Sequence, residues 1–93
     1  MWRIEEHRRV GKQLAAYPLE IRKRYEKWLD VASISDPPGL RAIRGFNDEA
    51  LSGTWRGHRS SRLNNQYRVI YRVVTAQQLF QVIEVKPHDC RRR

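Results

Sequence analysis

The chain has 93 residues, of which 19 are Lys or Arg and 10 are Asp or Glu, so its formal net charge is +9. A chain of this length buries only about 60–65% of its unfolded surface, and we expect one small domain over residues 1–93 that ends in a short basic tail, residues 91–93. The excess of positive charge predicts a polyanionic partner, because neutralising the phosphates of a nucleic acid releases bound counterions.

Secretion and membrane insertion are not expected. The N-terminal sequence MWRIEEHRRVG lacks the apolar run of a signal peptide, and no segment approaches the ~20 apolar residues of a membrane span. The single cysteine, Cys90, excludes an internal disulfide framework. These features predict a soluble protein in the reducing environment of the cytoplasm.

The first third of the chain predicts one strand and two helices. Apolar and polar residues alternate over residues 2–6, which indicates a strand, and helical spacing follows from His7 to the residue before Pro18. Pro18 can open the second helix, expected over residues 18–32. That helix has an apolar stripe, which we interpret as core and not as a partner surface, because a small domain has few other large side chains. The stripe consists of Ile21, Tyr25, Trp28 and Leu29.

The rest of the chain predicts a small antiparallel sheet. Turn residues at positions 35–39 interrupt regular structure, and strands are expected over residues 54–63, 67–74 and 79–85. The short connections between them favour a three-stranded antiparallel meander. The fold class is therefore α+β, with an N-terminal strand, an α-helical hairpin and then the meander, and with the helices packed on one face of the sheet.

A basic face is expected on this sheet. Trp55 and Tyr67 lie among the basic residues, and one of them could stack on a base. Alternation along residues 54–63 places Trp55 on the face opposite Arg56 and Arg62, which favours a core position for its indole. Arg68 begins the next strand, beside the end of the previous one, and the last strand ends near His88. A concave site at this edge would collect Glu49, Arg62, Arg68 and His88, and clustered cations of this kind suit an anion. RNA contacts are expected from Arg56, His58, Arg59, Lys86 and Arg91.

The order of elements, the run LSGTWRGHRSSRLNNQYRVIYRV and the ending VIEVKPHDCR resemble the RelE/ParE superfamily of bacterial toxins. Within it they are most similar to the RelE, YoeB and HigB mRNA interferases of type II toxin-antitoxin systems. The resemblance covers essentially the whole chain and is most specific over residues 49–71. It implies that Glu49 abstracts a proton, that Arg68 stabilises the phosphate under attack with Arg62 nearby, and that His88 is the general acid. Cys90 stands where the family often has a tyrosine.

This set of residue types suits RNA cleavage without a metal ion or other cofactor. The reaction removes a proton from a ribose 2′-OH, the oxygen attacks the adjacent phosphorus, and the departing 5′ oxygen takes up a proton. A carboxylate or a neutral imidazole can be the base and an imidazolium the acid, so the sequence leaves the roles of Glu49 and His88 interchangeable. Arginine supplies fixed donors for the developing charge. His88 and Cys90 do not have the spacing of a zinc site, and we predict none.

The resemblance also implies partners. These are mRNA in the A site of the 70S ribosome and a cognate antitoxin, for which we favour a helix-turn-helix protein of the HigA-like class. Two alternatives stay open: a ParE-like toxin that inhibits DNA gyrase, and a non-catalytic nucleic-acid-binding module, for which the basic hairpin alone would suffice. In the second case Glu49 is an ordinary solvated carboxylate, and His88 merely ends a strand.

Overall fold

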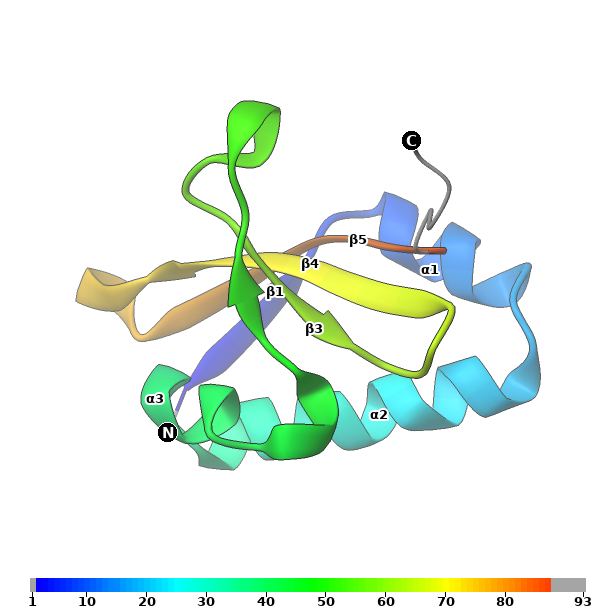
Figure 1. Ribbon diagram of the computed structural model, residues 1–93, viewed down its shortest axis with the longest axis horizontal. Helices are drawn as coiled ribbons and strands as arrows, with labels where there is room; N and C mark the ends of the chain where they lie inside the picture. The colour runs from blue at the N-terminus through cyan, green and yellow to red at the C-terminus, as the bar shows by residue number, and fades with distance from the viewer. Residues whose placement is uncertain (1, 88–93) are drawn as a thin grey trace.

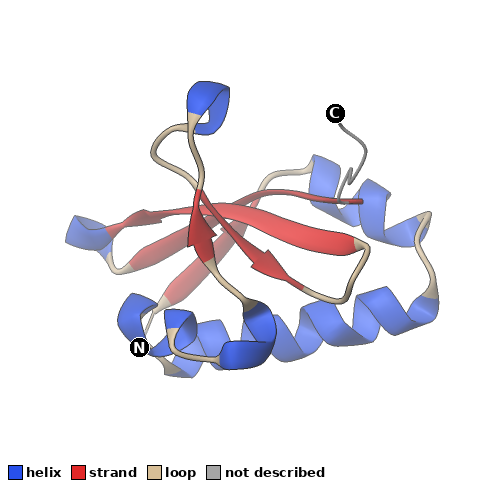
Figure 2. Ribbon diagram, viewed as in Figure 1, coloured by secondary structure: helices blue, strands red, loops and turns tan. Residues whose placement is uncertain are grey.

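A computed structural model describes residues 2–87, and in this part of the chain one long helix lies beneath a five-stranded sheet (Figures 1 and 2). The strand order is β1-β5-β4-β3-β2, in which β1 pairs with β5 in parallel and the other neighbours are antiparallel. The predicted α+β fold and its antiparallel meander are confirmed. The strands are β1 (Arg3–Glu6), β2 (Glu49–Ala50), β3 (Arg59–Arg62), β4 (Tyr67–Val74) and β5 (Leu79–Pro87).

The core lies between the sheet and helix α2 (Leu19–Ile34), which starts directly after Pro18 as predicted. The Trp28 ring is fully buried and packs against Tyr71 of β4 and Phe80 of β5, with ring centroids 5.4 and 6.1 Å away. The interpretation of the α2 stripe as core is confirmed. Ile21, Tyr25 and Trp28 of the stripe are buried and Leu29 is partly buried, and Ala32 of the same helix is buried with them.

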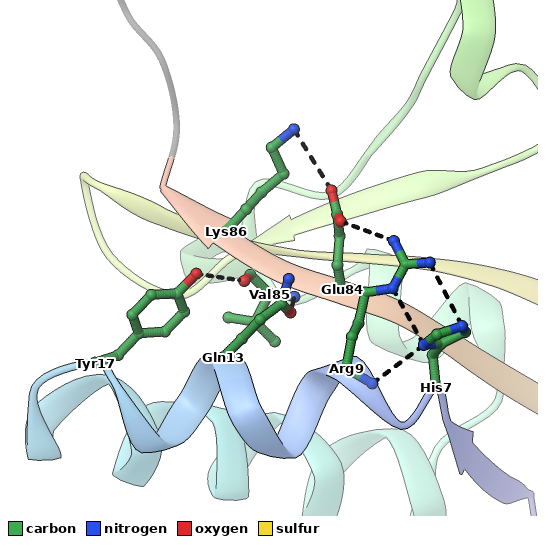
Figure 3. A network of polar contacts seen from close by, with 7 residues as sticks. All are labelled: His7, Arg9, Gln13, Tyr17, Glu84, Val85 and Lys86. Atoms are coloured by element: carbon green, nitrogen blue, oxygen red, sulfur yellow. Dashed lines mark hydrogen bonds and ion pairs between the residues drawn. The ribbon is translucent and has the colours of Figure 1, made fainter.

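Helix α1 (Arg9–Ala15) continues along the edge of β5 at the point where β1 ends. The backbone N–H of Val85 donates to Gln13 Oε1 at 2.8 Å, and the Tyr17 hydroxyl donates to the Val85 carbonyl at 2.9 Å (Figure 3). These side chains satisfy backbone groups that β1 is too short to reach. The end of β5, which carries Lys86, is thereby held in the fold.

Residues 35 and 36 interrupt regular structure as predicted, but residues 37–39 begin a helix where a turn was expected. Helix α3 (Pro37–Arg41) has Asp36 as its N-cap, whose side chain accepts from the Gly39 N–H at 2.9 Å. Proline is tolerated in the first helical turn because its missing N–H would be unpaired there anyway. Aspartate followed by proline therefore suits a helix start as well as a turn, and the prediction of a turn was wrong for residues 37–39.

The strand predicted over residues 54–63 is shorter than expected, because β3 contains only Arg59–Arg62. A 3-10 turn, η2 (Gly53–Trp55), precedes it, and Gly53 and Gly57 have φ of +67° and +89°. Such left-handed backbone interrupts a strand and favours glycine. Residues 51–58 instead form a projection, here called the β2–β3 arm, which extends from the sheet on the side away from α2 (Figure 1). Its base is closed by the Leu51 N–H, which donates to the His58 carbonyl at 3.0 Å.

Two further 3-10 turns complete the connections. η1 (Arg44–Phe46) lies in the segment between α3 and β2, for which no element was predicted. η3 (Thr75–Gln77) joins β4 to β5 where a short turn was predicted, and Gln78 takes a left-handed φ of +50° at its end.

Alkaline pH is expected to destabilise the fold through its buried tyrosines. Burial and the 2.6 Å hydrogen bond from the Tyr25 hydroxyl to Glu6 raise the pKa of Tyr25 far above its ordinary value. Above about pH 10 this tyrosine ionises only in the unfolded chain, so it should lower the free energy of unfolding by about 1.4 kcal/mol per pH unit. Urea unfolding of the wild type and Tyr25→Phe across that range checks this, and an equally steep decline in both proteins would contradict it.

Candidate functional site

The face of the sheet away from α2 carries two rows of cross-strand neighbours. Val69 and Tyr71 of β4 belong to the core, so the alternate residues Arg68 and Ile70 lie on the opposite face. In register, the first row is Arg62, Arg68 and Lys86, and the second is Glu49, Ser60, Ile70 and Glu84. We call these two rows the open-face site.

The first row brings together three cations from three strands. Adjacent strands lie about 4.8 Å apart, and like charges directly opposite each other are destabilising. An anion between Arg62, Arg68 and Lys86 would relieve this repulsion. The row therefore suits a phosphate group.

Glu49 and Arg68, which are far apart in the sequence, meet in this site as predicted. Arg68 Nη1 lies 4.0 Å from Glu49 Oε2 and 3.3 Å from Ser60 Oγ. The Arg68 side chain is 16% exposed, whereas that of Glu49 is 55% exposed. An ion pair this exposed contributes little to stability. The arrangement instead presents a solvent-accessible carboxylate next to an arginine that the sheet holds in place.

Arg62 flanks Arg68 in the cross-strand register, and it also lies at the hairpin end of the sheet. There it lines a cavity of about 580 Å³ together with residues of the hairpin turn and of α2. The cavity is polar, and its other lining residues include Glu20, Arg24, Asn64 and Gln66. Arg62 and Arg68 are thus cross-strand neighbours, as predicted, and Arg62 lies at the opposite end of the row from Lys86.

Glu84 supplies a second carboxylate at the other end of the site. Its side chain is only 14% exposed and accepts from Arg9 Nη1 at 3.3 Å, and Lys86 Nζ lies 3.5 Å away (Figure 3). Arg9 Nε in turn donates to His7 Nδ1 at 3.1 Å. The start of α1 is thus connected through Glu84 to Lys86, an arrangement that the sequence did not predict.

Asp48 is the other residue that the sequence analysis missed. Its side chain is fully buried and accepts from Arg59 Nε at 2.6 Å, Ser61 Oγ at 2.7 Å and the Tyr71 hydroxyl at 2.5 Å. These donors come from β3 and β4, so no local pattern around Asp48 signals the network. These hydrogen bonds fix the position of Asp48, the residue directly before Glu49 in the sequence.

The same network accounts for Arg59, which was expected to contact RNA. Its side chain is on the core side of β3, paired with Asp48. The structure does not support the predicted RNA contact, because alternation along β3 separates Arg59 from the face that carries Arg68.

The β2–β3 arm places Trp55 near the cationic row and not in the core. Lys86 Nζ lies 5.9 Å from the centroid of the half-buried Trp55 ring, and the His58 ring meets it edge-on at 5.2 Å. The prediction that Trp55 is a core residue was wrong, because it assumed an extended backbone where the chain makes a 3-10 turn. For the same reason Arg56 and His58 are arm residues and not strand residues.

Three expected residues, His88, Cys90 and Arg91, lie outside the described residues, and their roles stay predictions. The last described residue, Pro87, is the cross-strand partner of Tyr67. Within residues 2–87, no three His, Cys, Asp or Glu side chains are grouped as a metal ion would require. In the same residues, no helix is long and apolar enough to cross a membrane.

Comparison with solved structures identifies the fold, although no family profile and no curated protein matches this chain. It is similar to RelE in an archaeal RelE-RelB complex from Pyrococcus horikoshii, with 27% identity, a TM-score of 0.77, and 97% of this chain and 98% of that one covered. It is also similar to the Staphylococcus aureus YoeB-YefM complex, with 18% identity, a TM-score of 0.70 and coverage of 96% and 99%. A third similar structure is the RelBE2 toxin-antitoxin complex of Mycobacterium tuberculosis, with 15% identity, a TM-score of 0.69, and 94% of this chain and 98% of that one covered.

These likenesses extend over nearly the full length of each chain. The chain has the fold of RelE-like toxins of type II toxin-antitoxin systems, and the predicted resemblance to the RelE/ParE superfamily is confirmed.

Proposed function

Starting from a RelE-like toxin fold, we propose that this protein is the toxin of a type II toxin-antitoxin system and a metal-independent endoribonuclease. Its substrate is mRNA in the ribosomal A site, and cleavage there inhibits translation in the cytoplasm. The observation that carries this proposal is the approach of Glu49 to Arg68, 4.0 Å apart, where Arg68 is the middle member of a row of three cations. A protein that only binds nucleic acid needs the cations but has no use for an accessible carboxylate among them.

In the proposed mechanism, Glu49 takes the proton from the ribose 2′-OH and Arg68 donates hydrogen bonds to the phosphate oxygens. Arginine suits this role because its guanidinium stays charged and its donors are fixed in direction. Lys86 adds positive charge from the neighbouring strand. His88 is proposed to protonate the leaving 5′ oxygen. The products are a 2′,3′-cyclic phosphate and a 5′-hydroxyl.

Contacts to the RNA backbone are proposed for the cations around this centre. Arg56 is exposed on the β2–β3 arm, His58 lies beside it, and Arg62 extends the cationic row. Arg91 would add affinity that depends on salt and not on sequence. Arg59 is left out of this set because its guanidinium is paired with Asp48.

A cognate antitoxin is the proposed protein partner. The similar RelE and YoeB structures are complexes with RelB and YefM, which supports a partner of this kind. A helix-turn-helix antitoxin of the HigA-like class remains our preferred type.

The function is tested by primer extension on a defined mRNA in a purified translation reaction. We expect the wild type to cut within the A-site codon and isolated RNA to be cut poorly. A supercoiling assay with DNA gyrase, run in parallel, should show no inhibition. Intact mRNA together with growth arrest and gyrase inhibition would replace the proposal with the ParE-like alternative. His88→Ala separates the remaining alternative, since a binding module should keep its RNA affinity and a nuclease should lose its toxicity.

A further inference from the structure

We propose that Trp55 forms a nucleobase-binding subsite beside the phosphate site, in which the indole stacks on a base of the substrate RNA. The subsite rests on the proposed function, because it takes RNA as the ligand. It assigns base stacking to a residue for which the sequence analysis had favoured a core position. The proposal depends on where the arm places the ring, on which side chains surround it, and on what those side chains do to a nucleotide.

The surroundings of Trp55 differ from those of the other two tryptophans. Trp28 is fully buried among core rings, and Trp2 packs against Phe80 with ring centroids 5.4 Å apart. The ring neighbour of Trp55 is His58 of the same arm, at 5.2 Å, and Lys86 Nζ is 5.9 Å from its centroid. Trp55 is thus a half-buried indole with a histidine ring and a lysine among its neighbours, whereas the other two tryptophans pack against core aromatic rings.

Lys86 lies near both the Trp55 ring and the proposed phosphate site. Lys86 is the cross-strand partner of Arg68 and forms an ion pair with Glu84 at 3.5 Å. One lysine therefore lies between the indole and the arginine that is proposed to hold the scissile phosphate. A nucleotide carries its base and its phosphate on one ribose, so an aromatic ring beside a phosphate site matches both parts of one ligand.

Stacking is the usual way in which proteins hold the bases of single-stranded RNA, because every base has a π-face. An indole held by its neighbours loses little conformational freedom when a base binds. Loss of one such contact typically weakens binding by about 5- to 100-fold. The contact tolerates any base, so Trp55 should strengthen binding without restricting the sequence.

A purely structural role for Trp55 makes a different prediction. Ile70 and Ser60 lie on the open face, yet they are only 3% and 2% exposed, so longer side chains must cover them. If Trp55 were only part of that cover, leucine would replace it adequately. If it stacks on a base, phenylalanine should retain most of the effect and leucine should not.

The test measures binding and not cleavage. The probe is a fluorescein-labelled, 2′-O-methyl RNA oligonucleotide, which cannot be cut because its 2′ oxygens are blocked, and its matched control is the same backbone with abasic sites. We expect Trp55→Leu to weaken binding of the base-bearing RNA by about 5- to 100-fold, with little change for the abasic RNA. Trp55→Phe should stay within a few fold of wild type. Equal effects of Trp55→Leu on both RNAs, or no effect on either, would overturn the subsite.

A second measurement compares the unsubstituted chain with Trp55→Phe and does not depend on whether Trp55→Leu folds. Intrinsic fluorescence should fall when the base-bearing RNA binds, and Trp55→Phe should abolish most of that quenching. Quenching that persists in Trp55→Phe would overturn the proposal. Failure of the proposed function is separate, since it would appear as intact mRNA in the translation reaction whatever the binding data show.

Discussion

Glu49→Gln is expected to reduce mRNA cleavage by about 10²- to 10⁴-fold, the typical loss when a general base is removed. Glutamine keeps the size of the side chain and can still accept a hydrogen bond, but it cannot take a proton from the 2′-OH. Because Glu49 is half-exposed and its ion pair with Arg68 is long, the substitution should cost almost no stability. The loss should therefore appear in the rate of A-site cleavage in the translation reaction and not in the unfolding curve.

The matched control is Glu20→Gln, which makes the same chemical change on α2. Glu20 is also an exposed carboxylate, and it forms an ion pair with Arg24 at 3.2 Å, so the two variants alter net charge equally. Cleavage by Glu20→Gln should stay close to that of wild type. Arg68→Lys adds a test of geometry, since it keeps the charge but loses the fixed fork of donors. Undiminished cleavage by Glu49→Gln would remove Glu49 from the mechanism and leave His88 as the candidate base.

The parts of the fold that the sequence predicted are those specified by local periodicity. Helix α2 and strands β4 and β5 each present an apolar face to the core, and that face repeats along the chain with the period of its element. Strand β2 has two residues, too few for any period, and it exists because it pairs with Arg59 and Ser60 of β3. A strand that exists only because of such pairing cannot be predicted from a local sequence pattern.

The β2–β3 arm shows why an argument from alternation fails where the backbone turns. Trp55 was assigned to the core by counting residues along an assumed strand, and the left-handed backbone at Gly53 and Gly57 invalidates that count. Both glycines are present in the sequence, and glycine is the residue that most readily takes the left-handed backbone that interrupts a strand. The meeting of Glu49 with Arg68, in contrast, was predicted from the expected order of the strands, and the family resemblance gave the two residues their roles. Neither source predicted the ion pair of Asp48 with Arg59.

Asp48→Ala should be the most destabilising single substitution near the site, lowering the free energy of unfolding by about 3–5 kcal/mol. The carboxylate is fully buried and accepts hydrogen bonds from Arg59, Ser61 and Tyr71. Alanine would leave a partly buried guanidinium and two hydroxyls without their hydrogen-bond acceptor. Each of these donors would then be removed from water in the folded state without a hydrogen bond to offset the desolvation cost. Urea unfolding measures the change, and a loss below about 1 kcal/mol would show that solvent replaces the carboxylate.

Three further variants distinguish loss of the hydrogen-bond network from a general effect of losing an aspartate. Asp36→Ala removes the N-cap of α3 and should lower the free energy of unfolding by about 1 kcal/mol, the typical value for such a cap. Tyr71→Phe removes one donor to Asp48, so its effect and that of Asp48→Asn should be less than additive.

The same network gives Asp48 a consequence for cleavage. Asp48 is buried on the core side, and Glu49 follows it on the open face, so the buried carboxylate fixes the backbone that orients the proposed base. Asp48→Asn, assayed at a temperature where it remains folded, should therefore cleave mRNA more slowly than wild type. Its pH profile should keep the shape of the wild-type profile, because the proposed base itself is unchanged. A normal cleavage rate in the folded variant would confine Asp48 to a role in stability.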